Sequence, residues 1–251
     1  MKYALTIQYD GTEFSGSQLQ NDKFPVRTVQ GELENALCTL IEPKAQTIRP
    51  IKTVFSGRTD KGVSAEGQVV HFVSDKSFVA SKFIRSLNGI LPDDISVSEI
   101  ISVPDSFHAQ KSAKSRYYRF KFIHRKYRNV FDKNLLRVSY DIDIKRMQNS
   151  LNYLLGEHDF SAFKSAGTLN PSKICFIHKA DCQKIGDMVV IDIVGNRFLY
   201  NMVRTIVGTL LEIEGHNLTS EHMKMVLESK DRTKAGMTVS PFGLTLVKVE
   251  Y

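Results

Sequence analysis

The sequence is poor in cysteine and lacks any long apolar run. Its three cysteines, Cys38, Cys175 and Cys182, are an odd number and too few for a disulfide framework, which excludes a disulfide-stapled secreted domain. No apolar run approaches the roughly 20 residues of a membrane-spanning helix. Residues 1–8 alternate like a strand, so no secretory leader is expected. These absences predict a cytoplasmic protein that does not contact a membrane.

A recognisable metal-binding pattern is also missing. Cys175, His178 and Cys182 lie close in sequence, but a zinc site needs a fourth ligand at a suitable spacing, and none is nearby. In a regular strand, positions 175 and 182 would point to opposite faces because their separation is odd. The sequence therefore predicts no metal and no cofactor here, and the cysteines are expected to be buried or half-buried thiols.

The positive charge is concentrated in one part of the chain. The net charge is +7, from 34 basic and 27 acidic residues. The segment from Lys111 to Arg137 alone carries +9, so the rest of the chain is slightly acidic. Its basic residues are Lys111, Lys114, Arg116, Arg119, Lys121, Arg125, Lys126, Arg128, Lys133 and Arg137.

Aromatic residues alternate with these charges between Tyr117 and Phe131. Cations bind phosphates and flat rings stack on unpaired bases, so this composition is typical of a contact with single-stranded or loop RNA. The alternative is a solvated edge strand whose charges prevent aggregation. That role needs fewer charges, so we expect a nucleic-acid surface.

The periodicity of apolar residues predicts an α+β protein with two halves, residues 1–105 and 106–251. In the second half, Gly186-Asp187 predicts a tight hairpin between antiparallel strands. The expected strands are 2–9, 69–73, 95–103, 114–123, 174–185, 188–194 and 243–249, and the expected helices are 28–41, 81–91, 144–155, 198–213 and 219–228.

One loop presents a single carboxylate between two glycines. In Ser56-Gly57-Arg58-Thr59-Asp60-Lys61-Gly62-Val63, the glycines allow sharp turns that would expose Asp60. The alternative is an ordinary polar turn in which the aspartate bonds its own backbone.

Two further residues have both a structural and a functional interpretation. Tyr118 lies on a predicted strand whose alternation places it on one face with Arg116, Phe120 and Phe122, so it either packs in the core or forms a platform for a base. Arg204 lies at the edge of the apolar helix face that the sequence predicts. It either extends its guanidinium to water or holds a carboxylate ionised.

Together these segments resemble the TruA-type tRNA pseudouridine synthases over nearly the whole chain. The motifs that carry the resemblance are Tyr9-Asp10-Gly11-Thr12 with Phe14-Ser15-Gly16-Ser17-Gln18, Thr28-Val29-Gln30-Gly31-Glu32-Leu33-Glu34, Gly57-Arg58-Thr59-Asp60 with Gly62-Val63, Arg116 with Tyr118, Gly156-Glu157-His158-Asp159-Phe160, Gly195-Asn196 with Phe198-Leu199 and Met202-Val203-Arg204, and Gly243-Leu244.

The resemblance implies a fold, a reaction and roles for four residues. The two halves would be structurally similar, with mostly antiparallel strands forming a central sheet, helices outside and a catalytic cleft between the halves. The reaction would convert uridine to pseudouridine at positions 38, 39 or 40 of the tRNA anticodon stem-loop, in a homodimer without metal or cofactor. Asp60 resembles the essential carboxylate, Tyr118 the ring that stacks on the target base, Arg204 the partner of the carboxylate, and Arg58 a residue that helps extrude the nucleotide.

Some positions depart from the family pattern, and the departures concern substrate range more than reaction type. Ser17 stands where tryptophan is usual, and the chain contains no tryptophan. Lys61 and Ser64 replace alanine and histidine just after Asp60, and Phe120 replaces a frequent tyrosine.

Two other classes of function compete with the synthase. A non-catalytic RNA-binding or RNA-folding protein would use the same basic segment. A metal-dependent nuclease or phosphoesterase would combine Asp60 with acids such as Glu157 and Asp159, although the sequence has no paired-carboxylate motif.

Overall fold

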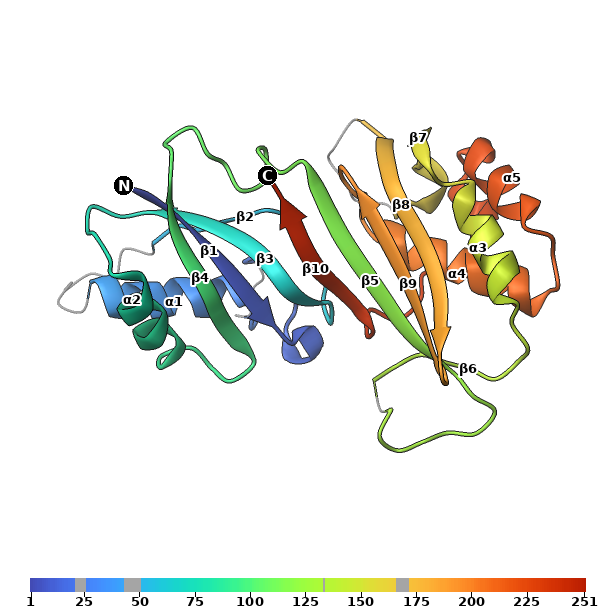
Figure 1. Ribbon diagram of the computed structural model, residues 1–251, viewed down its shortest axis with the longest axis horizontal. Coiled ribbons are helices and arrows are strands. Elements are labelled where there is room, and N and C mark those ends of the chain that lie inside the picture. Colours follow the sequence, from blue (N-terminus) through green and yellow to red (C-terminus); the bar gives the residue numbers. More distant parts are fainter. Residues whose placement is uncertain (21–25, 43–50, 133, 166–171) are drawn as a thin grey trace. The chain divides into compact units, whose positions relative to one another are not determined.

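The computed structural model describes residues 1–20, 26–42, 51–132, 134–165 and 172–251. The chain forms two compact units (Figure 1), the first comprising Met1–Lys114 with Leu246–Tyr251 and the second Ser115–Thr245. Each unit combines helices with mostly antiparallel strands, so the predicted α+β class is confirmed. Within the described ranges, no helix has both the length and the apolar character needed to cross a bilayer.

In the first unit a central strand pairs with a neighbour on each side. The elements are β1 (Lys2–Tyr9), η1 (Gly11–Glu13), α1 (Val29–Ile41), β2 (Val54–Phe55), β3 (Ser64–Val73), α2 (Ala80–Asn88) and β4 (Ile95–Val103). β1 lies between β4 and β3 and is antiparallel to both, and β2 pairs antiparallel with β3. β2 and β3 therefore hold the two ends of the loop that contains Asp60.

Helix α1 begins where the sequence predicts. The Thr28 hydroxyl accepts a hydrogen bond of 3.2 Å from the backbone N–H of Gly31, which satisfies one of the free donors of the first turn. Glu34 is buried on this helix, and its carboxylate accepts hydrogen bonds of 2.8 Å from the backbone N–H and the hydroxyl of Thr53. A buried carboxylate needs such partners, so α1 fixes the segment that leads into β2.

The second unit is built on four neighbouring antiparallel strands. Its strands are β5 (Ser115–His124), β6 (Arg137–Val138), β7 (Gly156–Asp159), β8 (Ile174–Ile185) and β9 (Met188–Gly195), followed by β10 (Leu244–Glu250), whose residues from 246 onward belong to the first unit. The order β5–β9–β8–β7 is antiparallel throughout, and β6 pairs parallel with β5. Gly186, at a φ of 58°, makes the predicted hairpin between β8 and β9.

Helices α3 (Ile144–Asn152), α4 (Met202–Gly215) and α5 (Glu221–Ser229) contact one another in the second unit, and α3 packs on β8 (Figure 1). Short 3-10 helices, η2 (Ser161–Phe163) and η3 (Arg232–Lys234), complete it. The predicted apolar residues of the α4 region, Leu199, Val203, Ile206 and Leu210, are all buried. The helix itself starts at Met202 rather than 198, because Asn201 has a φ of 61°, outside the helical region.

The expectation that Cys175 and Cys182 point to opposite faces is wrong. Both are buried, at 0% and 9% exposure. The pairing of β8 with β9 shifts register between Ile177 and Lys179, and the buried positions change from odd to even numbers across that irregularity. A bulge of this kind reverses the alternation of the residues after it. Burial raises the pKa of Cys175 to about 11 and that of Cys182 to about 12, so both thiols stay protonated at neutral pH.

Candidate functional site

Asp60 lies in the loop between β2 and β3 of the first unit, and its side chain is half-buried. The Asp60 carbonyl accepts a hydrogen bond of 3.1 Å from the N–H of Val63, which closes a tight turn. Gly62 in that turn has a φ of 81°, a conformation that favours glycine. The predicted need for glycine is thus confirmed at Gly62, whereas Gly57 is not among the glycines with positive φ.

The residue before Asp60 is held by buried hydrogen bonds from distant parts of the chain. The Thr59 hydroxyl lies 2.8 Å from the Tyr9 hydroxyl, and its backbone N–H donates to the Ser17 hydroxyl at 2.8 Å. The N–H of Ser17 donates back to the Thr59 carbonyl at 3.0 Å. Tyr9, Ser17 and Thr59 are all buried. Buried bonds of this kind resist opening, so the backbone that carries Asp60 is fixed in position.

Burial raises the pKa of Tyr9 to about 12, against the weaker effect of its hydrogen bonds to Thr59 and Gln68. The phenol is therefore neutral at physiological pH and acts as a structural hydrogen-bonding group. Gln68, which is fully buried on β3, donates from Nε2 to the Gly57 carbonyl at 2.9 Å and accepts from the Ser56 hydroxyl at 2.5 Å. Tyr9 and Gln68 thus support the loop from the strands beneath it.

Two glycines let the backbone of the 11–16 segment approach the Asp60 loop. A Cβ on Gly11 would lie 2.0 Å from the Val63 carbonyl oxygen, which no side chain can tolerate. A Cβ on Gly16, where φ is 114°, would lie 3.2 Å from the Thr59 carbonyl oxygen. Behind them, the Ser64 hydroxyl accepts from the Gly11 N–H at 3.0 Å. Two of the departures from the family pattern, Ser17 and Ser64, therefore take part in holding this loop.

Arg58 and Lys61, on either side of Thr59-Asp60, are exposed. They differ in this from Asp60, which is half-buried, and from Thr59, which is buried. The loop thus presents a carboxylate between two solvated cations, an arrangement suited to a polyanionic ligand.

Tyr118 lies on β5 of the second unit, where the predicted alternation is confirmed. Tyr118, Phe120 and Phe122 are buried, whereas Tyr117, Arg119 and Lys121 are half-buried. The ring of Phe198 packs against Tyr118 with centroids 5.0 Å apart and an interplanar angle of 77°. This edge-on contact fixes the plane of the Tyr118 ring, as a base platform requires.

Arg204 lies in the first turn of α4 and its guanidinium is bound by protein acceptors. Nε donates to the Val239 carbonyl at 2.8 Å, and Nη1 donates to the Asn201 side-chain oxygen at 2.8 Å. The segment containing Val239 approaches α4 closely, since a Cβ on Gly208 would lie 1.7 Å from the Met237 carbonyl oxygen. The alternative in which this arginine simply extends to water does not hold, because its side chain is directed by these bonds.

The structure thus places Asp60 and Arg58 in the first unit and Tyr118 and Arg204 in the second. Within the second unit, the segment that holds Phe198 and Asn201 contacts both Tyr118 and Arg204. Sequence reasoning missed Tyr9, Gln68 and Asn201 as supports of these residues. Tyr9 stands inside a quoted motif and Asn201 directly precedes Met202-Val203-Arg204, but the sequence does not show the partners of either residue.

Some cations of the basic segment are bonded within the protein, and others are exposed. Arg119 forms a two-bond ion pair with Asp192, at 2.8 and 2.9 Å, and Arg116 donates to the Asn196 carbonyl at 2.7 Å. Lys126 and Arg128, in contrast, are exposed in the loop after β5. Part of the predicted nucleic-acid charge therefore stabilises the fold, whereas Lys126 and Arg128 face solvent.

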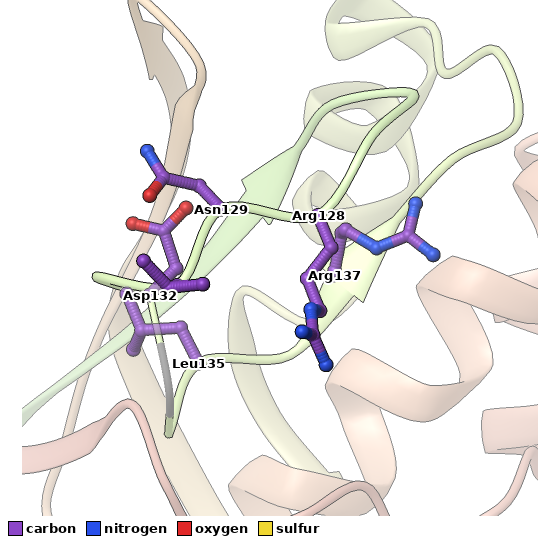
Figure 2. A pocket seen from close by; sticks show the side chains of 6 residues that line it. Arg128, Asn129, Asp132, Leu135 and Arg137 are labelled. Atoms are coloured by element: carbon purple, nitrogen blue, oxygen red, sulfur yellow. The ribbon is translucent and has the colours of Figure 1, made fainter.

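A cavity of about 330 Å³ opens in this loop. Figure 2 shows Arg128 and Arg137 on one side of it and Asn129, Asp132 and Leu135 on the other. Of these side chains, Arg137 donates to the backbone carbonyls of Arg125 and Lys126, and Asp132 pairs with Arg125 at 2.7 Å, so both take part in holding the loop.

The two acids of the competing nuclease hypothesis have different surroundings. Glu157 is exposed on β7. Asp159 accepts hydrogen bonds from the Ser161 N–H at 2.9 Å and its hydroxyl at 2.6 Å, and Lys230 lies 3.7 Å away. Burial would raise the pKa of Asp159, but these bonds and the lysine outweigh it and hold the pKa below its usual value. In the part of the chain that the structure describes, no group of three His, Cys, Asp or Glu side chains could hold a metal ion.

Comparison with known proteins places the chain in a class of RNA-modifying isomerases. A family model described as tRNA pseudouridine synthase matches residues 5–110 and 151–251, and the chain belongs to this family. Similar proteins named tRNA pseudouridine synthase A occur in Anoxybacillus flavithermus, with 43% identity over 98% of this chain and 97% of the relative, and in Geobacillus sp., with 42% identity over 98% and 96%. Another, from Shewanella amazonensis, is 40% identical over 100% of this chain and 93% of its own length.

Proposed function

We propose that this protein isomerises uridine to pseudouridine in the tRNA anticodon stem-loop, at positions 38, 39 or 40. Membership of the tRNA pseudouridine synthase family supports the reaction. The observation that carries the assignment of the site is the Asp60 loop, whose carboxylate is half-exposed while Thr59 beside it is locked by Tyr9 and Ser17. A fixed backbone behind an accessible carboxylate is what positional catalysis requires.

The reaction breaks the bond from ribose C1′ to uracil N1, turns the base and joins C5 to C1′. C5 then gives up its proton to a base or water and N1 takes one up, so the product is an isomer of the substrate. The target base must first leave its stack, which costs roughly a few kcal/mol. We assign Asp60 as the catalytic carboxylate, Tyr118 as the ring that receives the extruded base, and Arg58 as a cation that stabilises the extruded nucleotide. Arg204 is assigned to keep Asp60 ionised, because a nearby cation lowers the pKa of a carboxyl group. An isomerisation consumes no hydride, phosphate donor or water, so the proposal includes no cofactor or metal.

The proposal further places the enzyme in the cytoplasm as a homodimer acting on tRNA. The exposed cations of the basic segment would bind the tRNA backbone, because phosphates dominate the affinity of such complexes.

The direct test maps pseudouridine at single-nucleotide resolution in tRNA from cells with and without this protein, and in tRNA transcripts treated with the pure protein. We expect pseudouridine at positions 38–40 only when the protein is present, with activity unchanged in a metal chelator. Tight tRNA binding without any pseudouridine would instead indicate a non-catalytic RNA-binding protein. Loss of activity in the chelator would indicate a metal-dependent enzyme.

A further inference from the structure

The segment from Arg125 to Asp132, in the loop after β5, exposes three large apolar side chains within five residues. Tyr127 is 71% exposed, Val130 56% and Phe131 91%. Single exposed apolar residues are common, but a cluster like this one indicates a binding surface. None of the three contributes to the core of its unit, so the fold does not account for them.

The base of this loop is anchored, so its tip is presented by a fixed support. Arg125 pairs with Asp132 inside the loop and with Asp187 in the β8–β9 turn, each at 2.7 Å. Arg137 donates to the carbonyls of Lys126 at 2.8 Å and Arg125 at 3.2 Å. Arg125 and Arg137 at the base of the loop are therefore bonded within the protein, whereas the cations at its tip, Lys126 and Arg128, are exposed.

The tip combines rings with positive charge. Lys126 and Arg128 are exposed on either side of Tyr127, and the Lys126 ammonium lies 5.6 Å from the Tyr127 ring centroid. Arg128 and Arg137 line the cavity of about 330 Å³ shown in Figure 2. Rings stack on bases of any sequence and cations bind the phosphates between them, so the chemistry fits unpaired RNA.

We propose that the 125–132 segment of this loop is a second tRNA-docking surface, which binds unpaired nucleotides other than the target uridine. The family model matches residues 5–110 and 151–251, so this loop lies in the unmatched part between them. The inference rests on the proposed function for the identity of the RNA. The loop contributes affinity and substrate choice rather than chemistry, because it provides neither Asp60 nor the Tyr118 ring.

The test compares the double variant Tyr127→Ala/Phe131→Ala with wild type for tRNA binding and pseudouridine formation. Loss of two stacking platforms should raise the Kd and KM for tRNA by ~10-fold or more, with kcat nearly unchanged. A matched control is Met225→Ala, which removes a 57% exposed apolar side chain from α5. Unchanged Kd and KM in the double variant would overturn the proposal.

A second measurement tests the charge at the tip. Arg128→Ala should reduce the slope of log Kd against log salt by about 1, as expected for one lost phosphate contact, whereas Lys82→Ala on α2 should not. Since Kd is measured without catalysis, this result is independent of whether the protein forms pseudouridine.

Sedimentation of the Tyr127→Ala/Phe131→Ala variant tests the remaining alternative. A change in oligomeric state with unchanged tRNA binding would mean that the loop joins copies of the chain, and the RNA proposal would be wrong.

A separate observation concerns Asn201, which we infer to be a positioning residue for Arg204. Asn201 has a φ of 61°, and its amide oxygen accepts from Arg204 Nη1 at 2.8 Å while its amide nitrogen donates to the Ser165 hydroxyl at 2.9 Å. Asparagine adopts this conformation more readily than most non-glycine residues, and here its side-chain oxygen accepts the bond from Arg204. The side chain thus links the start of α4 to the guanidinium that we assign to Asp60.

The test uses Asn201→Gly, which keeps the backbone conformation and removes the amide, and Asn201→Asp, which keeps an acceptor oxygen. The glycine variant should lose kcat by about 10-fold or more, the scale of one hydrogen bond to a charged group. If Arg204 keeps Asp60 ionised, as proposed above, the acidic limb of the pH profile of this variant should move to higher pH. The aspartate variant should retain more activity, and Ser165→Ala should be nearly neutral. A glycine variant with wild-type kcat and pH profile would refute the inference even if its melting temperature fell.

Discussion

Replacing Asp60 by Asn is expected to lower pseudouridine formation by roughly three orders of magnitude or more, the scale seen when an enzyme loses an essential group. The amide has nearly the same shape as the carboxylate but cannot carry negative charge at the sugar. The side chain is half-buried, and Tyr9 and Ser17 hold the loop through Thr59, whose bonds the substitution does not touch. We therefore expect the fold to survive the change.

The measurement is single-turnover pseudouridine formation on a tRNA transcript, with tRNA binding and thermal unfolding measured in parallel. Binding should stay within about threefold of wild type, because phosphate contacts dominate it. Asp75→Asn makes the same chemical change at an exposed position of the first unit and should leave all three quantities unchanged. An Asp60→Asn protein that retained wild-type turnover would remove Asp60 from the mechanism, whatever the family resemblance suggests.

Local patterns predicted the regular elements well. The strands at Lys2–Tyr9, Ile95–Val103 and Ile174–Ile185 have the predicted bounds, and the Thr28 cap starts α1 as expected. These features depend on alternation, helical periodicity and capping chemistry, all of which involve neighbours in sequence. Strict alternation failed at the bulge in β8, after which Cys182 is buried like Cys175. The residue types at the bulge did not indicate it in the sequence.

The candidate site was predicted only at the level of residue identity. Motif resemblance pointed to Asp60, but the bonds that fix its loop join Thr59 to Tyr9, 50 residues away, and to Ser17, 42 residues away. Such partners depend on how distant segments pack, which periodicity does not encode. The alternation of residues in the basic segment likewise could not show that Arg119 forms an ion pair with Asp192. The sequence gives the number of basic residues in a segment, whereas their bonds within the folded protein determine how many of them can contact a ligand.

The largest expected effect on stability concerns an ion pair that joins α3 to α4. The carboxylate of Glu214 is 0% exposed and receives Arg146 Nε at 2.8 Å and Nη2 at 2.7 Å. It also accepts from the backbone N–H of Asp143, the residue that caps α3, at 2.7 Å. One side chain therefore satisfies three donors at the start of a helix.

Glu214→Ala should lower the free energy of unfolding by about 3 kcal/mol, because it leaves a partly buried guanidinium and a backbone donor without their acceptor. We place the value at the lower end of the range for buried pairs because Arg146 is 23% exposed and part of its charge reaches water. Glu214→Gln keeps an oxygen for the Asp143 N–H and should lose less. The measurement is urea unfolding of each variant.

The matched control is the exposed pair Lys224–Glu228 on α5, whose charged atoms lie 3.8 Å apart and whose side chains are 54% and 65% exposed. Glu228→Ala should change the unfolding free energy by less than about 1 kcal/mol, because solvent screens such pairs. Equal losses in Glu214→Ala and Glu228→Ala would show that burial of the Arg146 pair contributes nothing beyond a surface contact. If the buried pair does fix α3 on α4, Glu214→Ala should also reduce kcat modestly, since Arg204 is carried by the first turn of the same helix.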